Sequence, residues 1–262
     1  MIDKEKIELA KAVLKNEACG YYKNKELIEK LFKDSFKDDN KNNILLRLTV
    51  IDSFYSTNMQ KKYFAIEEIA RELIAYNIKS DDFKSFIKKG NDSVKDIFEK
   101  KYGFGKPTSR QSGAKGAWSL ISKYAYFLTG KQFPIYDKFV KDMICPGSSV
   151  GFDKFINHFR EKNISDYDGF DNYAWLCGKI KNGSMYLVLG EQELKTLFEK
   201  FEEDKQKIAN IKSKKIDTEI ANFIRINYSN LFPSPLKDFI KIIIKQFLET
   251  KTMNKIDMDK II

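Results

Sequence analysis

The chain has 262 residues, 42% of them apolar and 14% aromatic, so it can bury a sizeable core in one domain or two. It has no apolar run long enough for a membrane span, and its scattered Cys19, Cys145 and Cys177 fit neither a disulfide framework, a zinc site nor a four-cysteine iron–sulfur cluster. These features predict a cytoplasmic protein, and the net charge of +10 favours a nucleic-acid partner, although a Lys-rich genome would also give that charge.

The first third of the chain shows sustained helical periodicity. Residues 2–15 and 25–37 are predicted as amphipathic helices separated by the turn-like segment CGYYKN, and the charged start of the first is unlike a signal peptide. Residues 44–58 form the most apolar stretch. Its length and leucine content favour a buried helix over a strand, and its polar ending SFYSTN matches ordinary helix capping.

Three more helices are expected before a break in the pattern. They cover residues 66–76, 81–89 with Ser80 as the cap, and 93–101 opening at Asp92-Ser93. The segment YGFGKPTSRQSGAKG, residues 102–116, then combines glycines with the cations Lys106, Arg110 and Lys115. Such a loop can bring backbone N–H groups and cations to phosphates, or it can be a flexible linker; its spacing excludes a Walker motif.

The segment after the break holds the two residues of greatest chemical interest. Residues 117–128 are predicted as a helix with a broad apolar face, and Lys123 falls largely off that face. Thr129-Gly130 ends this helix, and Asp137 stands at the cap position of the next one. Asp137 follows Lys123 by 14 residues. Because the chain doubles back between them, the two side chains are expected to face one cleft.

The remaining chain is also predicted to be helical. One helix ends near Cys145-Pro146-Gly147, and two more cover residues 152–161, with the lone His158, and 171–179. A lone histidine cannot form a His-rich metal site, so no metal site is predicted. From residue 191 the sequence becomes a charged helical extension. The expected domains are therefore a core of residues 1–190, in two lobes with a break near 102–116, and an extension of residues 191–262.

The segments SKYAYFL and FPIYDKFV resemble the core of the helix-hairpin-helix DNA glycosylases, especially those acting on 8-oxoguanine. In that family a catalytic lysine near a helix start is followed by a short apolar connection and an aspartate that caps the next helix. The likeness covers about a third to a half of the chain. Two features differ from the family pattern: QSGAKGAWSLIS replaces the glycine-rich hairpin, and the Lys-to-Asp separation is about one turn shorter.

The resemblance implies an all-α, two-lobed glycosylase-like fold with a C-terminal helical extension. It also implies base excision from double-stranded DNA by a monomeric enzyme without metal or cofactor, with Lys123 as nucleophile, Asp137 as its carboxylate partner, and strand-nicking AP-lyase activity. The other implied residues contact DNA or line the base pocket. The DNA-binding set is Lys106, Arg110, Lys115, Ser119, Ser122 and Lys138, and the pocket set is Tyr55, Asn58, Tyr126 and Trp175.

Two other classes of function remain open. The first is a non-catalytic helical DNA-binding or phage-defence protein on the same fold, in which Lys123 is a surface cation and Asp137 only a helix cap. The second is a structural interaction protein whose C-terminal helices dock a partner. DNA binding that weakens steeply with salt would separate the glycosylase and the DNA-binding protein from the structural interaction protein. Borohydride trapping would then separate the glycosylase from the non-catalytic DNA-binding protein.

Overall fold

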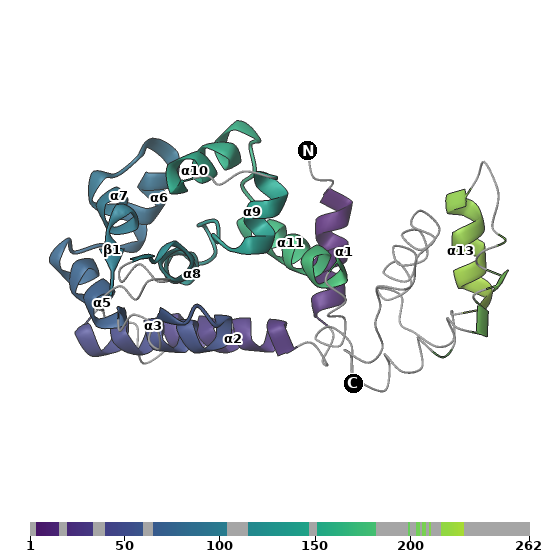
Figure 1. Ribbon diagram of the computed structural model, residues 1–262, viewed down its shortest axis with the longest axis horizontal. Helices are drawn as coiled ribbons and strands as arrows, with labels where there is room; N and C mark the ends of the chain where they lie inside the picture. The colour runs from purple at the N-terminus through teal and green to yellow at the C-terminus, as the bar shows by residue number, and fades with distance from the viewer. Residues whose placement is uncertain are drawn as a thin grey trace, which may run out of the picture. The chain divides into compact units, whose positions relative to one another are not determined.

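The protein is all-α, as the sequence predicts (Figure 1). The structure, a computed structural model, describes the following parts of the chain: residues 4–15, 20–33, 40–59, 65–103, 115–146, 151–181 and 216–227, with six single residues between 199 and 210. The helices in these parts are α1 (Lys4–Leu14), α2 (Gly20–Lys33), α3 (Lys41–Tyr55), α5 (Ile66–Ala75), α6 (Ser80–Lys89), α7 (Asp92–Glu99), α8 (Trp118–Leu128), α9 (Lys138–Ile144), α10 (Phe152–Glu161), α11 (Tyr167–Lys181) and α13 (Ile216–Asn227).

The strand content of the described residues is limited to one short ladder at the ends of the glycine-rich segment. Strand β1 (Lys101–Tyr102) pairs antiparallel with β2 (Lys115–Gly116), so the chain leaves and re-enters the helical core at one place. The intervening residues, including Lys106 and Arg110, lie outside the described residues. Directly after the ladder, the Trp118 indole donates a hydrogen bond to the Phe98 carbonyl (2.6 Å), which fixes the start of α8 against the end of α7.

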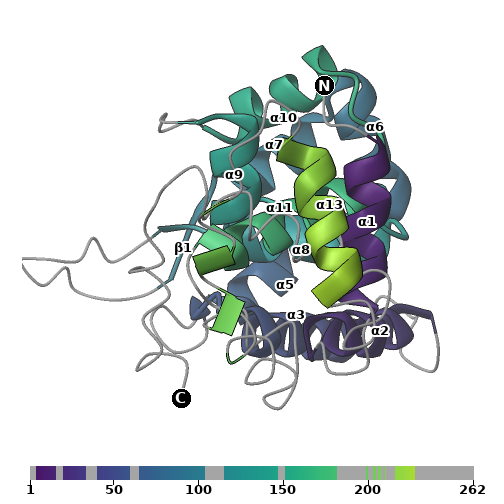
Figure 2. The same cartoon turned by 90° about the vertical axis from the view of Figure 1, so that its right-hand side faces the viewer.

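The chain divides into two compact units. The first contains residues Lys23–Trp175, and the second contains Ile2–Tyr22 with Leu176–Ile262. The predicted domain boundary at residues 190 and 191 lies outside the described residues. Helices on both sides of the glycine-rich segment belong to the first unit, where α8 packs on α3 and on α6 (Figures 1 and 2). Among the described helices, none has the length and apolar character that crossing a membrane requires.

Several helix starts differ from the prediction. Helix α2 begins at Gly20, so CGYYKN is not a turn between two helices, and α11 begins at Tyr167 rather than Asp171. The earlier start of α11 has a local cause, because the Asp166 carboxylate accepts a hydrogen bond from the Gly169 N–H (2.8 Å) and so caps a free donor. Ser80 is the first residue of α6 and not its cap.

Helix α8 corrects the prediction of a polar face. Lys123, predicted to fall largely off the apolar face, is 2% exposed, and its neighbours Ser122 and Tyr126 on the same helix are fully buried. The reason is position: α8 runs through the middle of the first unit (Figure 1) and is enclosed on every side, as expected for a helix that supplies the centre of a core. Lys123 is therefore a buried lysine and not a surface cation.

Phenylalanine rings form the core beside α8. The Phe98 ring lies 3.8 Å from the Phe152 ring and 5.9 Å from Phe133, both nearly parallel to it. Phe152 in turn contacts Tyr136, with ring centroids 5.9 Å apart. Because Tyr136 precedes Asp137, this core supports the segment that carries the candidate carboxylate.

Candidate functional site

The connection between α8 and α9 sets the positions of Lys123 and Asp137. Gly130 has φ 63°, the left-handed conformation that ends a helix at low cost, as predicted. The Ser122 hydroxyl accepts a hydrogen bond from the Tyr136 N–H (2.9 Å). Since Ser122 precedes Lys123 and Tyr136 precedes Asp137, this bond fixes the register of the two segments that bear the candidate site.

The Lys123 amine is enclosed by polar and aromatic groups. It is 2% exposed, donates a hydrogen bond to the Ser119 hydroxyl (2.7 Å), and lies 5.1 Å from the centroid of the Tyr55 ring. Burial lowers the pKa of Lys123 below its ordinary value of 10.5, and the charges of Asp137 and Asp171 oppose that shift only in part. A neutral amine, which is the nucleophilic form, is thereby favoured relative to an exposed lysine.

Asp137 is confirmed as the cap of α9. Its carboxylate accepts a hydrogen bond from the Val140 N–H (2.9 Å). Burial raises the pKa of Asp137 above its ordinary value of 3.8, while the positive charge of Lys123 acts in the opposite direction. Lys123 and Asp137 thus interact through their charges. The pKa of Lys123 is lowered and the pKa of Asp137 is raised, so each shift favours the neutral form of its group.

The end of α3 brings Tyr55 to the same place. Burial, followed by the charges of Asp171 and Asp137, raises the pKa of Tyr55 well above its usual range, so the hydroxyl stays protonated. Asp52 shapes the turn that follows, because its carboxylate accepts hydrogen bonds from the Met59 N–H (2.9 Å) and the Thr57 hydroxyl. In that turn Asn58 has φ 60° and donates to the Ser56 carbonyl, so its amide has a local structural role.

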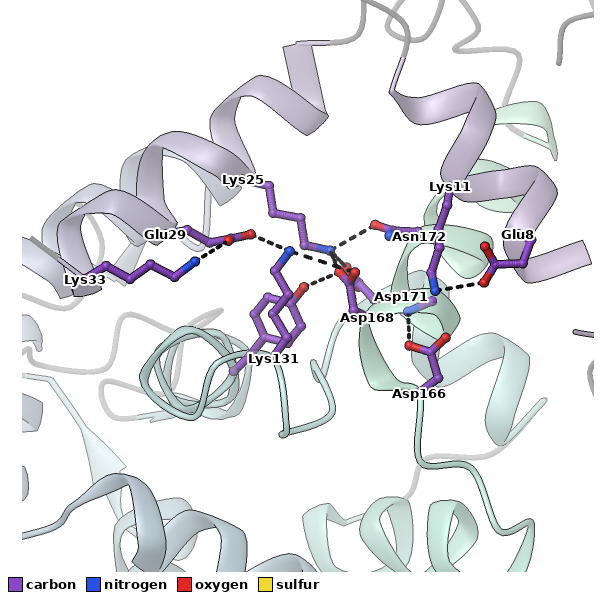
Figure 3. A network of polar contacts seen from close by, with 12 residues as sticks. Glu8, Lys11, Lys25, Glu29, Lys33, Lys131, Asp166, Asp168, Asp171 and Asn172 are labelled. Carbon is purple, nitrogen blue, oxygen red and sulfur yellow. Dashed lines mark hydrogen bonds and ion pairs between the residues drawn. The ribbon is translucent and has the colours of Figure 1, made fainter. Parts of the chain in front are cut away.

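A second buried lysine, which the sequence reasoning missed, lies in the first unit (Figure 3). Lys25 of α2 is 1% exposed, and its three N–H donors have three acceptors on α11: Asp168 at 2.9 Å, Asp171 at 2.8 Å and Asn172 at 2.9 Å. Burial alone would lower the pKa of Lys25, but the charges of Asp171 and Asp168 raise it above 10.5. Lys25 is therefore a permanent cation.

Tyr126, a predicted base-pocket residue, connects this cluster to α8. Its hydroxyl donates to Asp168, and the Lys25 amine lies 4.9 Å from the centroid of its ring. Lys131 adds a second cation to this group of residues. Its amine forms an ion pair with Glu29 and lies 3.9 Å from a carboxylate oxygen of Asp168 (Figure 3). Lys25, Glu29, Lys131, Asp168, Asp171 and Asn172 are called the α2–α11 cluster below.

Acid is expected to weaken the α2–α11 cluster through Asp168. Burial alone would raise the pKa of Asp168, but Lys25, the Tyr126 hydroxyl and Lys131 lower it below 3.8. The stabilisation from the ionised Asp168 carboxylate is therefore complete above pH 3.8, the ordinary pKa of an aspartate. It is lost as the pH falls toward the lower pKa that Asp168 has in the folded protein. In urea unfolding, the wild type should exceed Asp168→Asn in free energy of unfolding near neutral pH, and the difference should shrink below pH 3.8. A difference that is constant with pH would contradict this assignment.

The other predicted site residues have varied positions. Ser119 and Ser122 point their hydroxyls into internal hydrogen bonds, whereas Lys138 is exposed at the start of α9. Trp175 is half-buried on α11, and the side chains of Lys106, Arg110 and Lys115 lie outside the description. The structure thus brings Lys123, Asp137, Tyr55 and Tyr126 into one part of the first unit, while the DNA-contacting role of the other residues stays a prediction.

Comparison with known proteins gave a match to a family model. Residues 4–132 match the family model HI_0787_N, described as an N-terminal domain. The match covers just under half of the chain, and it includes Lys123 and Lys25 but ends before Asp137 and before the acidic residues of α11. Neither curated proteins nor solved structures gave a match. The chemistry of the site therefore carries the functional interpretation.

Proposed function

We propose that the protein is a DNA base-excision glycosylase with AP-lyase activity, in which Lys123 is the nucleophile and Asp137 its carboxylate partner. The observation that carries the proposal is the Lys123 amine, which is 2% exposed, has its pKa lowered by burial and interacts through its charge with the capping carboxylate of Asp137. Residues whose pKa values are strongly shifted by burial and by a nearby charge cluster at functional sites. The two-lobed glycosylase-like arrangement is part of the same proposal.

The chemistry requires a neutral amine in a dry site. The Lys123 nitrogen forms a bond to the sugar carbon that bears the target base, and the bond between that carbon and the base breaks, with its electron pair leaving on the base. Asp137 stabilises the positive charge that develops on the sugar and accepts the proton released by the attacking amine. Ring opening, with the ring oxygen taking the proton held by Asp137, then gives a Schiff base; loss of a proton from the adjacent sugar carbon to water expels the 3′ phosphate and cleaves the strand.

Substrate entry requires that a flipped base replace the contacts that now enclose Lys123. The Ser119 hydroxyl and the Tyr55 ring both interact with the amine, and Tyr55 offers an aromatic surface against which a base can stack. Lys138, exposed one residue after Asp137, is suited to a phosphate contact at the same place. Double-stranded DNA is therefore the proposed partner.

Borohydride trapping tests the proposal. Duplexes carrying one oxidised base, one deaminated base or one abasic site are incubated with the full chain and reduced, and the modified peptide is identified by mass spectrometry. A covalent adduct on Lys123 is expected, because reduction converts a Schiff base into a stable amine. An adduct on a different lysine would overturn the role of Lys123, and the absence of any adduct with the abasic duplex would overturn the lyase activity.

Asp137→Asn separates the charge of this residue from its capping role. Asn caps helices about as well as Asp, so the free energy of unfolding should change by less than about 1 kcal/mol. Adduct formation should slow by about a hundredfold or more, since the carboxylate no longer stabilises charge or accepts a proton. Loss of Asp137 also removes a charge that raises the pKa of Lys123, so the slower reaction would not reflect a more protonated amine. Trapping at the wild-type rate would remove Asp137 from the mechanism.

A DNA-binding protein without catalysis is the second candidate. The observation that favours it is the enclosure of Lys123, which is 2% exposed and hydrogen-bonded to Ser119. In that case the wild type binds duplexes with an affinity that falls steeply with salt, yet no substrate or abasic duplex gives an adduct.

A further inference from the structure

Two buried lysines among the described residues of the first unit flank one group of aromatic rings. Lys25 lies over the Tyr126 ring at 4.9 Å, and Lys123 lies over the Tyr55 ring at 5.1 Å. Phe127 lies between these rings, 4.9 Å from Tyr126 and 6.3 Å from Tyr55. The α2–α11 cluster and the Lys123 site are thus linked through a layer formed by the Tyr126, Phe127 and Tyr55 rings. Charges in such a buried region interact more strongly than in water.

Asp171 belongs to both sites. It accepts a hydrogen bond from the Lys25 amine at 2.8 Å, and its charge also acts on Lys123, Asp137 and Tyr55. The charged and titratable groups that face Lys123 come from three elements: Asp137 at the start of α9, Asp171 on α11 and Tyr55 on α3. Both carboxylates raise the pKa of Lys123 against the larger effect of burial, so a cation paired with one of them limits that opposition.

We infer that Lys25 is a positioning residue for the Lys123 amine: it neutralises Asp171 and holds that carboxylate on the α2 side of the aromatic layer. Lys25 does not touch the reacting atoms; it acts through Asp171. The inference rests on the proposed function for its catalytic meaning, but the expected effect of Lys25 on the protonation of Lys123 can be measured whether or not the protein processes DNA.

The experiment is an NMR titration of the full-length protein labelled with ¹³C at the lysine ε-carbon. The Lys123 resonance is assigned by its absence in Lys123→Gln. Lys25→Met leaves Asp171 without its cation, so the pKa of Lys123 should rise by about one unit. Asp171→Asn keeps the shape and an acceptor for Lys25 but removes the negative charge, so the pKa of Lys123 should fall. Opposite shifts from two partners of one ion pair are not expected from a purely structural role.

Lys33→Met is the matched control on the same helix. Lys33 is exposed and pairs only weakly with Glu29 at 3.4 Å, so this variant should leave the Lys123 titration unchanged.

Lys25→Met can fail to fold, because it leaves buried carboxylates without a cation. The double variant Lys25→Met with Asp171→Asn removes one charge of each sign, and it should fold and return the titration of Lys123 toward that of the wild type.

The outcomes separate the two proposals. If Lys123 titrates identically in the wild type and in Asp171→Asn, the inference about Lys25 is overturned, whatever the trapping assay gives. If the titration shifts as expected but no abasic duplex is trapped, the glycosylase proposal fails and the electrostatic link stands. Where trapping succeeds, the pH dependence of adduct formation should move to higher pH in Lys25→Met and to lower pH in Asp171→Asn. Lys25→Arg, which keeps the charge, should stay close to the wild type in both measurements.

Discussion

Lys123→Gln is expected to abolish Schiff-base trapping on an abasic duplex, with a loss of at least about a thousandfold. The amide of Gln has no nucleophilic lone pair, but it nearly matches the length of the lysine and keeps a group that can hydrogen-bond to Ser119. Because the lysine amine is buried at an electrostatic cost, its replacement by a neutral side chain should not destabilise the fold by more than about 1 kcal/mol.

Lys138→Gln is the matched control for this variant. Lys138 is exposed and lies one residue after Asp137, so its loss should weaken DNA binding and lower the salt slope by about one, while trapping persists at saturating DNA. Lys123→Gln should show the reverse pattern, with DNA affinity retained and trapping lost. Wild-type trapping by Lys123→Gln would remove Lys123 from the proposed mechanism.

Phe98→Ala is expected to lower the free energy of unfolding by about 3–5 kcal/mol, the usual cost of removing a buried phenylalanine ring. The Phe98 ring is 1% exposed and lies against Phe152, Phe133 and Phe86, all within 6.1 Å between centroids. Urea unfolding measures the loss. Since Phe152 also supports Tyr136, the cavity is expected to loosen the Asp137 segment as well.

Two controls accompany this measurement. Phe54→Ala makes the same change at a ring that is 40% exposed on α3, and it should cost less than about 1 kcal/mol. Phe98→Leu keeps most of the apolar volume and should cost less than about 1.5 kcal/mol. Equal destabilisation by Phe54→Ala and Phe98→Ala would contradict the description of Phe98 as the centre of the aromatic core.

Local signals in the sequence predicted much of the helical framework. Asp137 as a cap, Gly130 as a left-handed helix end and a helix over residues 152–161 are all confirmed, because each depends on residues within one or two turns. The start of α2 was predicted wrongly. CGYYKN contains small and polar residues typical of turns, but the helix begins at Gly20 and continues through the tyrosines.

The electrostatic environment of the site could not be predicted in the same way. Periodicity placed Lys123 off the apolar face of its helix, but α8 is enclosed by other helices, and enclosure depends on the whole fold. Lys25 did carry a signal, since it lies three residues before the buried Ile28 and seven before Phe32, on the inner face of α2. Its partner Asp171 is 146 residues away, and no spacing rule connects residues at that distance.

The Ser122–Tyr136 and Lys25–Asp171 hydrogen bonds join residues at very different sequence separations, and this difference affects the order of folding. The Ser122–Tyr136 hydrogen bond closes a loop of only 14 residues, whereas the Lys25–Asp171 bond joins segments 146 residues apart. Short loops close at a smaller entropic cost, and the amino-terminal part of a chain leaves the ribosome first. The α8–α9 connection can therefore form before α11 leaves the ribosome, and the pairing of Lys25 with α11 follows it. A nascent chain that stops before α11 can form the Ser122–Tyr136 hydrogen bond but lacks the carboxylates of Asp168 and Asp171 that pair with Lys25.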